Sequence, residues 1–261
     1  MYAILLNELQ PLDLEKTSRI LAKASGLLYA DATRAVRTCT GILAKNLPCD
    51  EATRIADELN AIGVGCFTMA MAEMVQPPDA RPLNGIGLTP DLFGPMDIYG
   101  HVMPIPWEHV VLLSLGHISE QRRERFSMGA EGFEDAAAMS YGMGGAIRRA
   151  MQDPPKREVR EAAKYVLDIF ARHPTEGHWR IAHNGFNYAC LGPAITQRTD
   201  ENFRLLVNEL VRCATSCFSN NGLIAYMNNE PERSYTYGDT RQFDEENLWL
   251  LQKVYLNLRA Q

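Results

Sequence analysis

Apolar residues recur near the N-terminus with the two spacings that distinguish strands from helices. An unbroken apolar run over 3–6 predicts a strand, and a helical spacing over 13–23 predicts a helix that begins at Asp13 and ends at Gly26. The next predicted elements are a helix over 30–39, a short apolar segment over 42–47, a helix over 50–62 and a strand over 64–71. We therefore expect residues 1–74 to form a small module with the element order β-α-α-β-α-β.

The rest of the chain predicts more strands and two closing helices. Proline and glycine crowd residues 75–106, which predicts a linker or a long irregular connection. Mostly apolar residues over 107–118 then predict a buried strand. Further strands are predicted over 165–171 and 179–191, and amphipathic helices over 200–214 and 243–258.

The predicted fold class is α+β, with the module followed by a β-rich domain over 107–261 that two amphipathic C-terminal helices close. An insertion is predicted within that domain at 119–156, where arginines adjoin a stretch rich in glycine, alanine and methionine.

Composition and charge narrow the class of protein. Hydrophobic residues make up 46% and charged residues 22% of the chain, which is typical of a folded globular protein. The formal net charge of −6 disfavours a nucleic-acid partner. No apolar run reaches the roughly 18 residues of a membrane span, and no basic segment precedes the first apolar run, so we expect neither a membrane anchor nor a secretory signal. The six scattered cysteines lack the spacing of a disulfide framework, which indicates a reducing compartment and predicts a cytoplasmic protein.

Three stretches of the N-terminal module carry a family resemblance. They are YAILLNE (2–8), AVRTCTG (35–41) and EATRIADELNAIGVGCFTM (51–69). In this order and spacing they resemble the fold shared by the ribosomal stalk protein C-terminal domain and the Clp protease adaptor. The resemblance covers about a quarter of the chain and implies recognition of a protein partner.

The resemblance also implies which residues contact that partner. Stalk domains dock translation factors through basic residues at the places of Arg34 and Arg37, and the adaptor holds its substrate with an asparagine and an acid, at the places of Asn7 and Glu8. Leu9 and Thr40 stand where the adaptor has a second acid and a histidine, so a different protein partner is expected.

The β-rich part resembles a bacterial pleckstrin-homology-like domain, because Pro106, Trp107 and Val110 open a strand and an amphipathic helix follows the later strands. It is also similar to an uncharacterised bacterial family that ends in helices like those at 202–210 and 243–251. A likeness of fold does not by itself imply a function.

No sequence motif assembles a catalytic site, and no nucleophile elbow is present. An alternative hypothesis is an enzyme with a dispersed site in the β-rich domain. Its candidate residues are His178, His183, Asn184 and Tyr188.

Other candidate groups have ordinary structural explanations. The groups considered are the histidines 101, 109, 117 and 173, the pair Cys213 and Cys217 at helical spacing, the glycines 142, 144 and 145, and the acids 244–246 near the start of the last helix. Arginines 122, 123, 125, 148 and 149 suggest a second alternative, an anionic-ligand-binding protein. The sequence predicts no catalytic residue, no metal and no cofactor, and it favours a non-catalytic protein-interaction protein.

Overall fold

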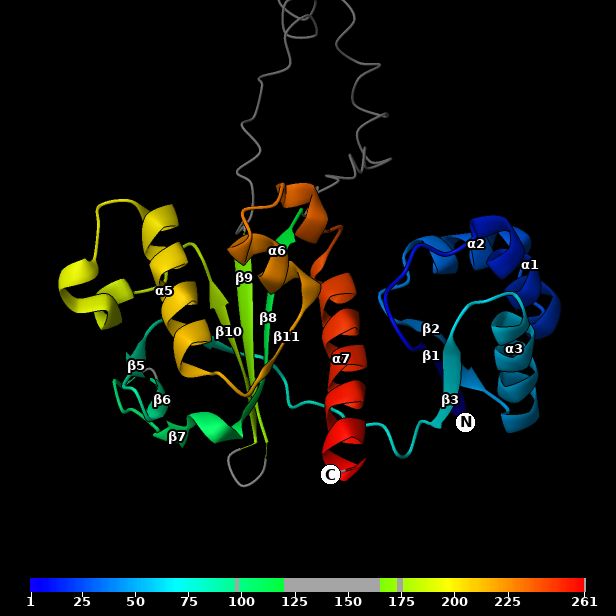
Figure 1. Cartoon of the computed structure of the whole chain (residues 1–261), viewed down its shortest axis with the longest axis horizontal. Coiled ribbons are helices and arrows are strands. Elements are labelled where there is room, and N and C mark those ends of the chain that lie inside the picture. The colour runs from blue at the N-terminus through cyan, green and yellow to red at the C-terminus, as the bar shows by residue number, and fades with distance from the viewer. Residues whose placement is uncertain (97–98, 120–164, 173–175, 261) are drawn as a thin grey trace, which may run out of the picture. The chain divides into compact units, whose positions relative to one another are not determined.

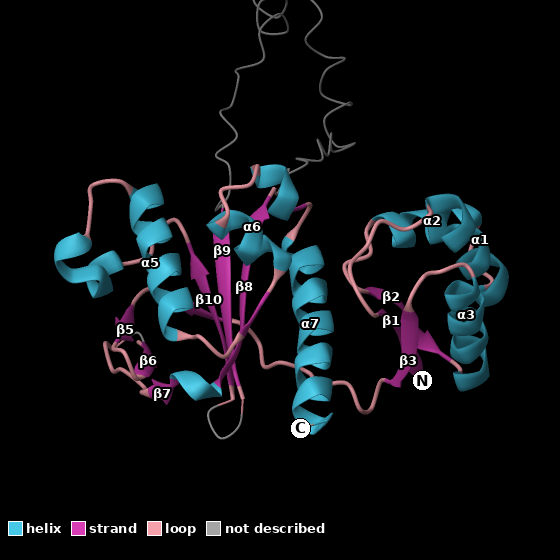
Figure 2. Cartoon of the chain, in the orientation of Figure 1, coloured by secondary structure: helices cyan, strands magenta, loops and turns pink. Residues whose placement is uncertain are grey.

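The computed structural model describes residues 1–96, 99–119, 165–172 and 176–260. Helices and several sheets make up these residues, so the predicted α+β class is confirmed (Figures 1 and 2). Apart from Ser119, the predicted insertion at 119–156 lies outside the described residues.

The N-terminal module contains one three-stranded antiparallel sheet and three helices. Its elements are β1 (Tyr2–Leu6), α1 (Leu14–Ser25), α2 (Tyr29–Arg37), β2 (Ile42–Leu47), α3 (Cys49–Ala61) and β3 (Cys66–Ala70), and the strand order is β2-β1-β3. The backbone N–H of Lys16 donates to the Asp13 carboxylate at 3.1 Å, and Gly26 ends α1 with a left-handed φ of 64°. The capping residues expected from the sequence therefore act at both ends of α1.

The two faces of this small sheet are buried by different elements. Ile4 and Leu6 point into a core formed with the three helices of the module. Ala3 and Leu5 share the opposite cluster with Trp249, which lies on α7 (Thr240–Ala260). The Trp249 Nε1–H donates to the Leu6 carbonyl at 2.7 Å, so α7 is fastened to the module by both apolar and polar contacts.

A larger mixed sheet forms the centre of the β-rich part. It contains β4 (Arg81–Leu83), β8 (Val110–Ile118), β9 (Tyr165–Ala171), β10 (Gly177–Ala182), β11 (Phe218–Ser219) and β12 (Thr236–Tyr237). The strands β8, β9 and β10 are antiparallel neighbours, and β4 pairs in parallel with β10 at one edge. Both β11 and β12 pair in parallel with β8.

Helices cover both faces of this sheet (Figure 2). The helices α5 (Thr199–Cys213) and α6 (Asn221–Met227) bury one face around Leu113 and Ile169. The C-terminal half of α7 packs on the other face, where Leu251 and Val254 contact Phe170 and its neighbours. Because successive side chains of β8, β9 and β10 point to opposite faces of the sheet, these strands contribute to two hydrophobic cores.

The segment 75–106 differs from the predicted connection, because it forms strands and part of the core. It supplies β4 and a separate antiparallel sheet with the order β5-β6-β7. Those three strands are β5 (Ile86–Leu88), β6 (Leu92–Pro95) and β7 (Ile105–Pro106). Phe93 and Ile105 are fully buried beside Trp107 and Trp179. Strands of two to four residues are too short to show an alternating pattern.

The predicted strand over 179–191 is also shorter than expected. The strand β10 ends at Ala182, Gly185 adopts a left-handed φ of 87°, and a 3₁₀ segment follows at Tyr188–Ala194. None of the helices in the described part of the chain combines the length and apolar character needed to cross a bilayer.

Candidate functional site

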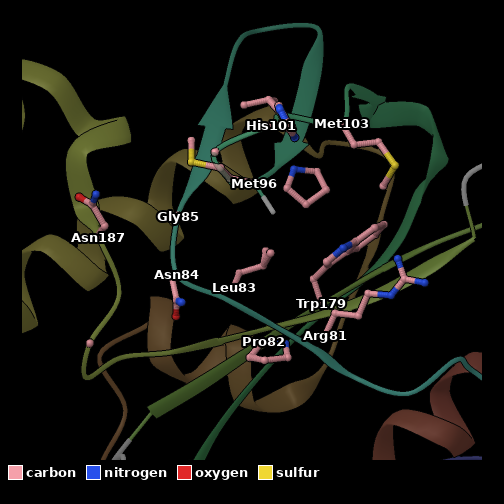
Figure 3. Close-up of a pocket in the computed structure, with 14 residues that line it drawn as sticks. Arg81, Pro82, Leu83, Asn84, Gly85, Met96, His101, Met103, Trp179 and Asn187 are labelled. Carbon is pink, nitrogen blue, oxygen red and sulfur yellow. The ribbon is translucent and has the colours of Figure 1, made fainter. Parts of the chain in front are cut away.

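A cavity of about 910 Å³ lies between β4, the end of β10 and the small β5-β6-β7 sheet (Figure 3). Arg81, Leu83 and Trp179 come from the edge of the large sheet, whereas Met96 and Met103 come from the small sheet and the segment beside it. The volume is in the range of small-molecule pockets, which is roughly 300–1,000 Å³. No local sequence pattern predicts this cavity, because its walls meet only through long-range strand pairing.

Trp179 is held firmly in the wall of this cavity. Its side chain is 2% exposed, and its ring lies edge-on to Phe93 at a centroid distance of 5.6 Å. A Cβ atom added at Gly177 would lie 2.1 Å from the Trp179 ring, so the bare glycine makes room for the indole. In the parallel β10–β4 pairing Trp179 is the register partner of Arg81, which places these two side chains on the same face.

Hydrogen-bond donors along this wall lack acceptors. The indole N–H groups of Trp107 and Trp249 donate to backbone carbonyls at 3.0 and 2.7 Å, whereas no described residue accepts a hydrogen bond from the Trp179 Nε1–H. The Arg81 guanidinium likewise makes no ion pair or hydrogen bond with any described residue. The Asn187 side-chain oxygen accepts from the Ala189 N–H at 3.0 Å, and no described residue accepts from its NH₂ group.

A contrasting polar cluster is buried between the same sheet and α7. Ser114, Asp168 and Arg180 are register partners across β8, β9 and β10. The fully buried Asp168 carboxylate accepts from Arg180 Nε at 2.7 Å and Nη2 at 2.6 Å, and from Asn247 Nδ2 at 3.0 Å. The His178 Nε2 atom lies 2.8 Å from the same carboxylate. We name these five residues the Asp168 cluster.

The charged groups of the Asp168 cluster pair with one another. Burial lowers the pKa of the Arg180 guanidinium, but Asp168 and Asp244 outweigh this effect and raise the pKa above its usual range. The Ser114 hydroxyl donates to the Asn247 side-chain oxygen. Because each polar side chain finds a partner, the cluster joins α7 to the sheet and leaves no reactive group free.

The residues of the enzyme alternative do not form one site. His178 stacks on Phe170 on the face that α7 covers, with a centroid distance of 4.1 Å. His183 lies five residues later, beside Phe203 of α5 on the other side of the sheet. The Tyr188 hydroxyl donates to the His183 carbonyl, and the Asn184 side-chain oxygen lies 2.9 Å from His183 Nδ1, so both support His183 rather than His178.

Asn7 and Glu8 are exposed immediately after β1. The Lys253 ammonium of α7 donates to the Asn7 carbonyl at 2.7 Å and lies 4.7 Å from the Trp249 ring centroid. Glu8 lines a second cavity of about 390 Å³ together with Trp249 and Lys253. The chain's own ammonium group thus contacts the corner that the adaptor resemblance assigns to a partner.

Arg34 and Arg37 lie on another element, the exposed side of α2. At 100° per residue they point away from the buried Ala32 and Val36. Neither guanidinium makes an ion pair with the residues that the structure describes. Immediately before them, Leu27, Leu28 and Tyr29 are 46%, 74% and 49% exposed. We name Leu27, Leu28, Tyr29, Arg34 and Arg37 the α2 surface.

The ordinary explanation expected for the acids 244–246 is that they lie in the first turn of the last helix, where the helix dipole stabilises negative charge. For Glu246 this expectation is wrong. Since α7 begins at Thr240, Glu246 lies beyond the first turn of that helix. Glu246 is also buried, with only 5% of its surface exposed. The Tyr237 hydroxyl donates to the Glu246 carboxyl at 2.8 Å. Burial raises the pKa of Glu246, while the hydrogen bonds from Tyr237 and Asn220 oppose that rise. The helix dipole therefore does not account for this residue.

The predicted cysteine pair also needs a correction. Because α5 ends at Cys213, Cys217 lies beyond the helix rather than one turn along it. Burial raises the pKa of Cys217 to about 11, which keeps it a thiol near neutral pH. In the described ranges, no three or more histidine, cysteine or acidic residues form a group that could hold a metal ion.

Several candidate residues lie outside the described part of the chain. They are His173, the glycines 142, 144 and 145, and the arginines 122, 123, 125, 148 and 149. Comparison with known proteins gave no match: no family model, no curated protein and no solved structure is similar enough to the chain to count as one. The function is therefore inferred from the residues of the chain itself.

Proposed function

We propose that the chain is a non-catalytic protein-interaction protein, and that the α2 surface is where its partner docks. The observation that carries this proposal is the exposure of three consecutive large apolar side chains, Leu27 to Tyr29, at the start of the helix that also carries two arginines without a described ion pair. Exposed apolar groups rimmed by charge are characteristic of protein interaction sites. The resemblance of the module to stalk and adaptor domains, which recognise proteins, gives further support.

The chemistry of this surface defines the partner. Two guanidinium groups attract carboxylates and can bind them with paired hydrogen bonds. Leu28, the most exposed of the three apolar residues, requires an apolar contact. The partner is therefore an acidic protein segment that also carries apolar side chains. The overall negative charge of the chain weighs against a nucleic-acid partner.

The cysteines support a location for this function. All six are free thiols, which is the expected state in a reducing compartment. We accordingly place the protein in the cytoplasm.

Removing the whole module would be an ambiguous test of this proposal. Its sheet covers Trp249 and shares a cluster with it, so deletion would expose new apolar surface on α7. Point variants on the exposed side of α2 avoid this problem, because the Arg34 and Arg37 side chains make no described hydrogen bond or ion pair.

The test is quantitative affinity capture from a lysate of the native cells, comparing the wild-type chain with Arg34→Glu/Arg37→Glu and with Leu28→Asp. Both variants should lose the same captured proteins by about tenfold or more, since charge reversal and a buried carboxylate each cost an interface several kcal/mol. The control is Arg233→Glu, which reverses an exposed arginine without a described ion pair on another element and should change nothing. Equal capture by all four proteins would contradict the proposal.

A further inference from the structure

We infer that the cavity between β4, β10 and the β5-β6-β7 sheet binds a small organic carboxylate with an apolar body. This site is separate from the α2 surface and does not depend on it. Its described lining comes from β4 and the residues after it, from β10 and the turn that follows, and from the end of β6 and the segment between β6 and β7 (Figure 3). None of these belongs to the N-terminal module.

The first reason is the unmatched donor in the buried wall. The Trp179 Nε1–H is not sealed from solvent, so it meets the water of the cavity, whereas the other two tryptophans of the chain donate to backbone carbonyls. Trp179 is 2% exposed and no described residue accepts from its Nε1–H, although the residue lines the cavity. Since Phe93 and Gly177 fix its ring, the N–H cannot turn away to another partner. An acceptor atom of a ligand would satisfy it.

The second reason is charge. Arg81 is the register partner of Trp179 and carries a guanidinium that no described residue neutralises. None of the described residues that line the cavity has a carboxylate. Among the described lining residues Arg81 carries the permanent positive charge, so the complementary ligand group is an acceptor with negative charge, while the Asn84 amide offers both a donor and an acceptor.

The third reason is the composition of the remaining wall, which selects a carboxylate over a more highly charged anion. A guanidinium forms two parallel hydrogen bonds with one carboxylate, and a single unpaired arginine balances a single negative charge. Leu83, Met96 and Met103 supply apolar surface beside it. Methionine side chains adapt to aliphatic or aromatic groups of different shape, which suits the body of such a ligand.

The probe for this site is 3-phenylpropionate, titrated calorimetrically into the full chain. Its neutral amide, 3-phenylpropionamide, has nearly the same shape and serves as the matched ligand. Inorganic phosphate tests whether negative charge alone is sufficient. The carboxylate should bind at one site and at least about tenfold more tightly than the amide, because a charge-assisted pair with Arg81 is lost in the amide. Phosphate should bind more weakly than the carboxylate.

Two variants assign the binding to the proposed residues. Arg81→Gln should weaken the carboxylate about tenfold or more and leave the weaker amide nearly unchanged. Trp179→Phe keeps the apolar ring but removes the N–H donor, and it should weaken both ligands several-fold. Arg233→Gln, an exposed arginine outside the cavity, is the control and should leave both affinities unchanged.

A nuclear magnetic resonance measurement keeps the test decisive even if the affinities are low. The Trp179 indole N–H signal is identified by its absence from Trp179→Phe, and it should move downfield as 3-phenylpropionate is added, since it then gains an acceptor. The signals of Trp107 and Trp249, which already donate to carbonyls, should stay in place. Absence of carboxylate binding, equal binding of the amide, tighter binding of phosphate, or an unchanged affinity in Arg81→Gln would each overturn the inference.

Discussion

Arg180 and Arg81 lie on neighbouring strands of one sheet, yet their surroundings are opposite. Arg180 on β10 makes hydrogen bonds to Asp168 and Asp244 beneath α7, and its side chain is 18% exposed. Arg81 on β4 is exposed and meets no described acidic group beside the cavity. The guanidinium group of Arg180 therefore belongs to a buried hydrogen-bonded cluster, whereas that of Arg81 lines an open cavity.

The comparison of the two arginines distinguishes polar side chains that stabilise the fold from polar side chains that are available to a ligand. A buried polar group that is fully hydrogen-bonded contributes to the specificity of the fold, and removing one partner leaves another buried and unsatisfied. A donor without a protein acceptor contributes no hydrogen bond to the fold, and beside a cavity it is available to a ligand. The Asp168 cluster fits the first description, and the wall formed by Trp179 and Arg81 fits the second.

Asp168→Asn should have the largest effect of the changes predicted here. It removes the negative charge between Arg180 and His178 inside a fully buried cluster. Breaking a buried pair of this kind costs about 3–5 kcal/mol. Urea unfolding at neutral pH measures the loss. Asp244→Asn is the matched control, because Asp244 contacts the same arginine but is 49% exposed, so its loss should stay below about 1 kcal/mol. Similar losses in both variants would remove the distinction between a buried and a surface partner.

Gly177→Ala should have an intermediate effect on stability and a clear effect on the cavity. The new methyl group would lie 2.1 Å from the rigid Trp179 ring, and overpacking of this kind costs about 1–3 kcal/mol. Gly85→Ala is the control on the same cavity, since its methyl group would meet only Met96 Sδ, at 3.8 Å. Thermal unfolding and 3-phenylpropionate titration of both variants measure the two effects. If Gly177→Ala keeps the wild-type melting temperature and affinity, Trp179 is not held as described.

Glu246→Gln tests a buried acid outside the Asp168 cluster. Burial raises the pKa of this carboxyl in the folded chain, so the unfolded chain gives up the proton first as pH rises above the ordinary glutamate value of about 4.3. The wild-type chain should therefore lose stability relative to Glu246→Gln as pH increases from about 4, and the difference should level off once the folded carboxyl has ionised. Melting temperatures at pH 4 and pH 8 measure this change, with the exposed Glu108→Gln as control. A difference between the two chains that is identical at both pH values would contradict the raised pKa.

Arg34→Gln/Arg37→Gln should have the smallest effect on stability. Both side chains are exposed and make no described ion pair, so the free energy of unfolding should change by less than about 0.5 kcal/mol. Urea unfolding followed by circular dichroism checks this. A loss of more than about 1 kcal/mol would mean that the two arginines support the fold and are not reserved for a partner.

Local signals in the sequence predicted the elements that such signals control. Asp13 and Gly26 marked α1 correctly because capping involves only neighbouring residues. The strands β8 and β9 were evident as long apolar runs, and the stripe that includes Phe203 and Leu210 marked α5.

The features that depend on distant pairing could not be predicted in this way. Arg81 and Trp179 become neighbours only through a parallel pairing of strands that are far apart in the chain, and nothing in either local sequence sets that register. The cross-strand neighbours Ser114, Asp168 and Arg180 could not be predicted either, because their register also depends on strand pairing. The strands β5 to β7 were missed because proline and glycine dominate their segment and each strand is very short.

The polar groups around β10 divide into a set that stabilises the fold and a set that faces the cavity. Urea unfolding of Arg180→Gln and Arg81→Gln separates the two sets. Arg180→Gln should lose about 3 kcal/mol, because Asp168 is left buried without its main partner, whereas Arg81→Gln should stay within about 0.5 kcal/mol of wild type. Equal losses in the two variants, or a larger loss in Arg81→Gln, would contradict this division.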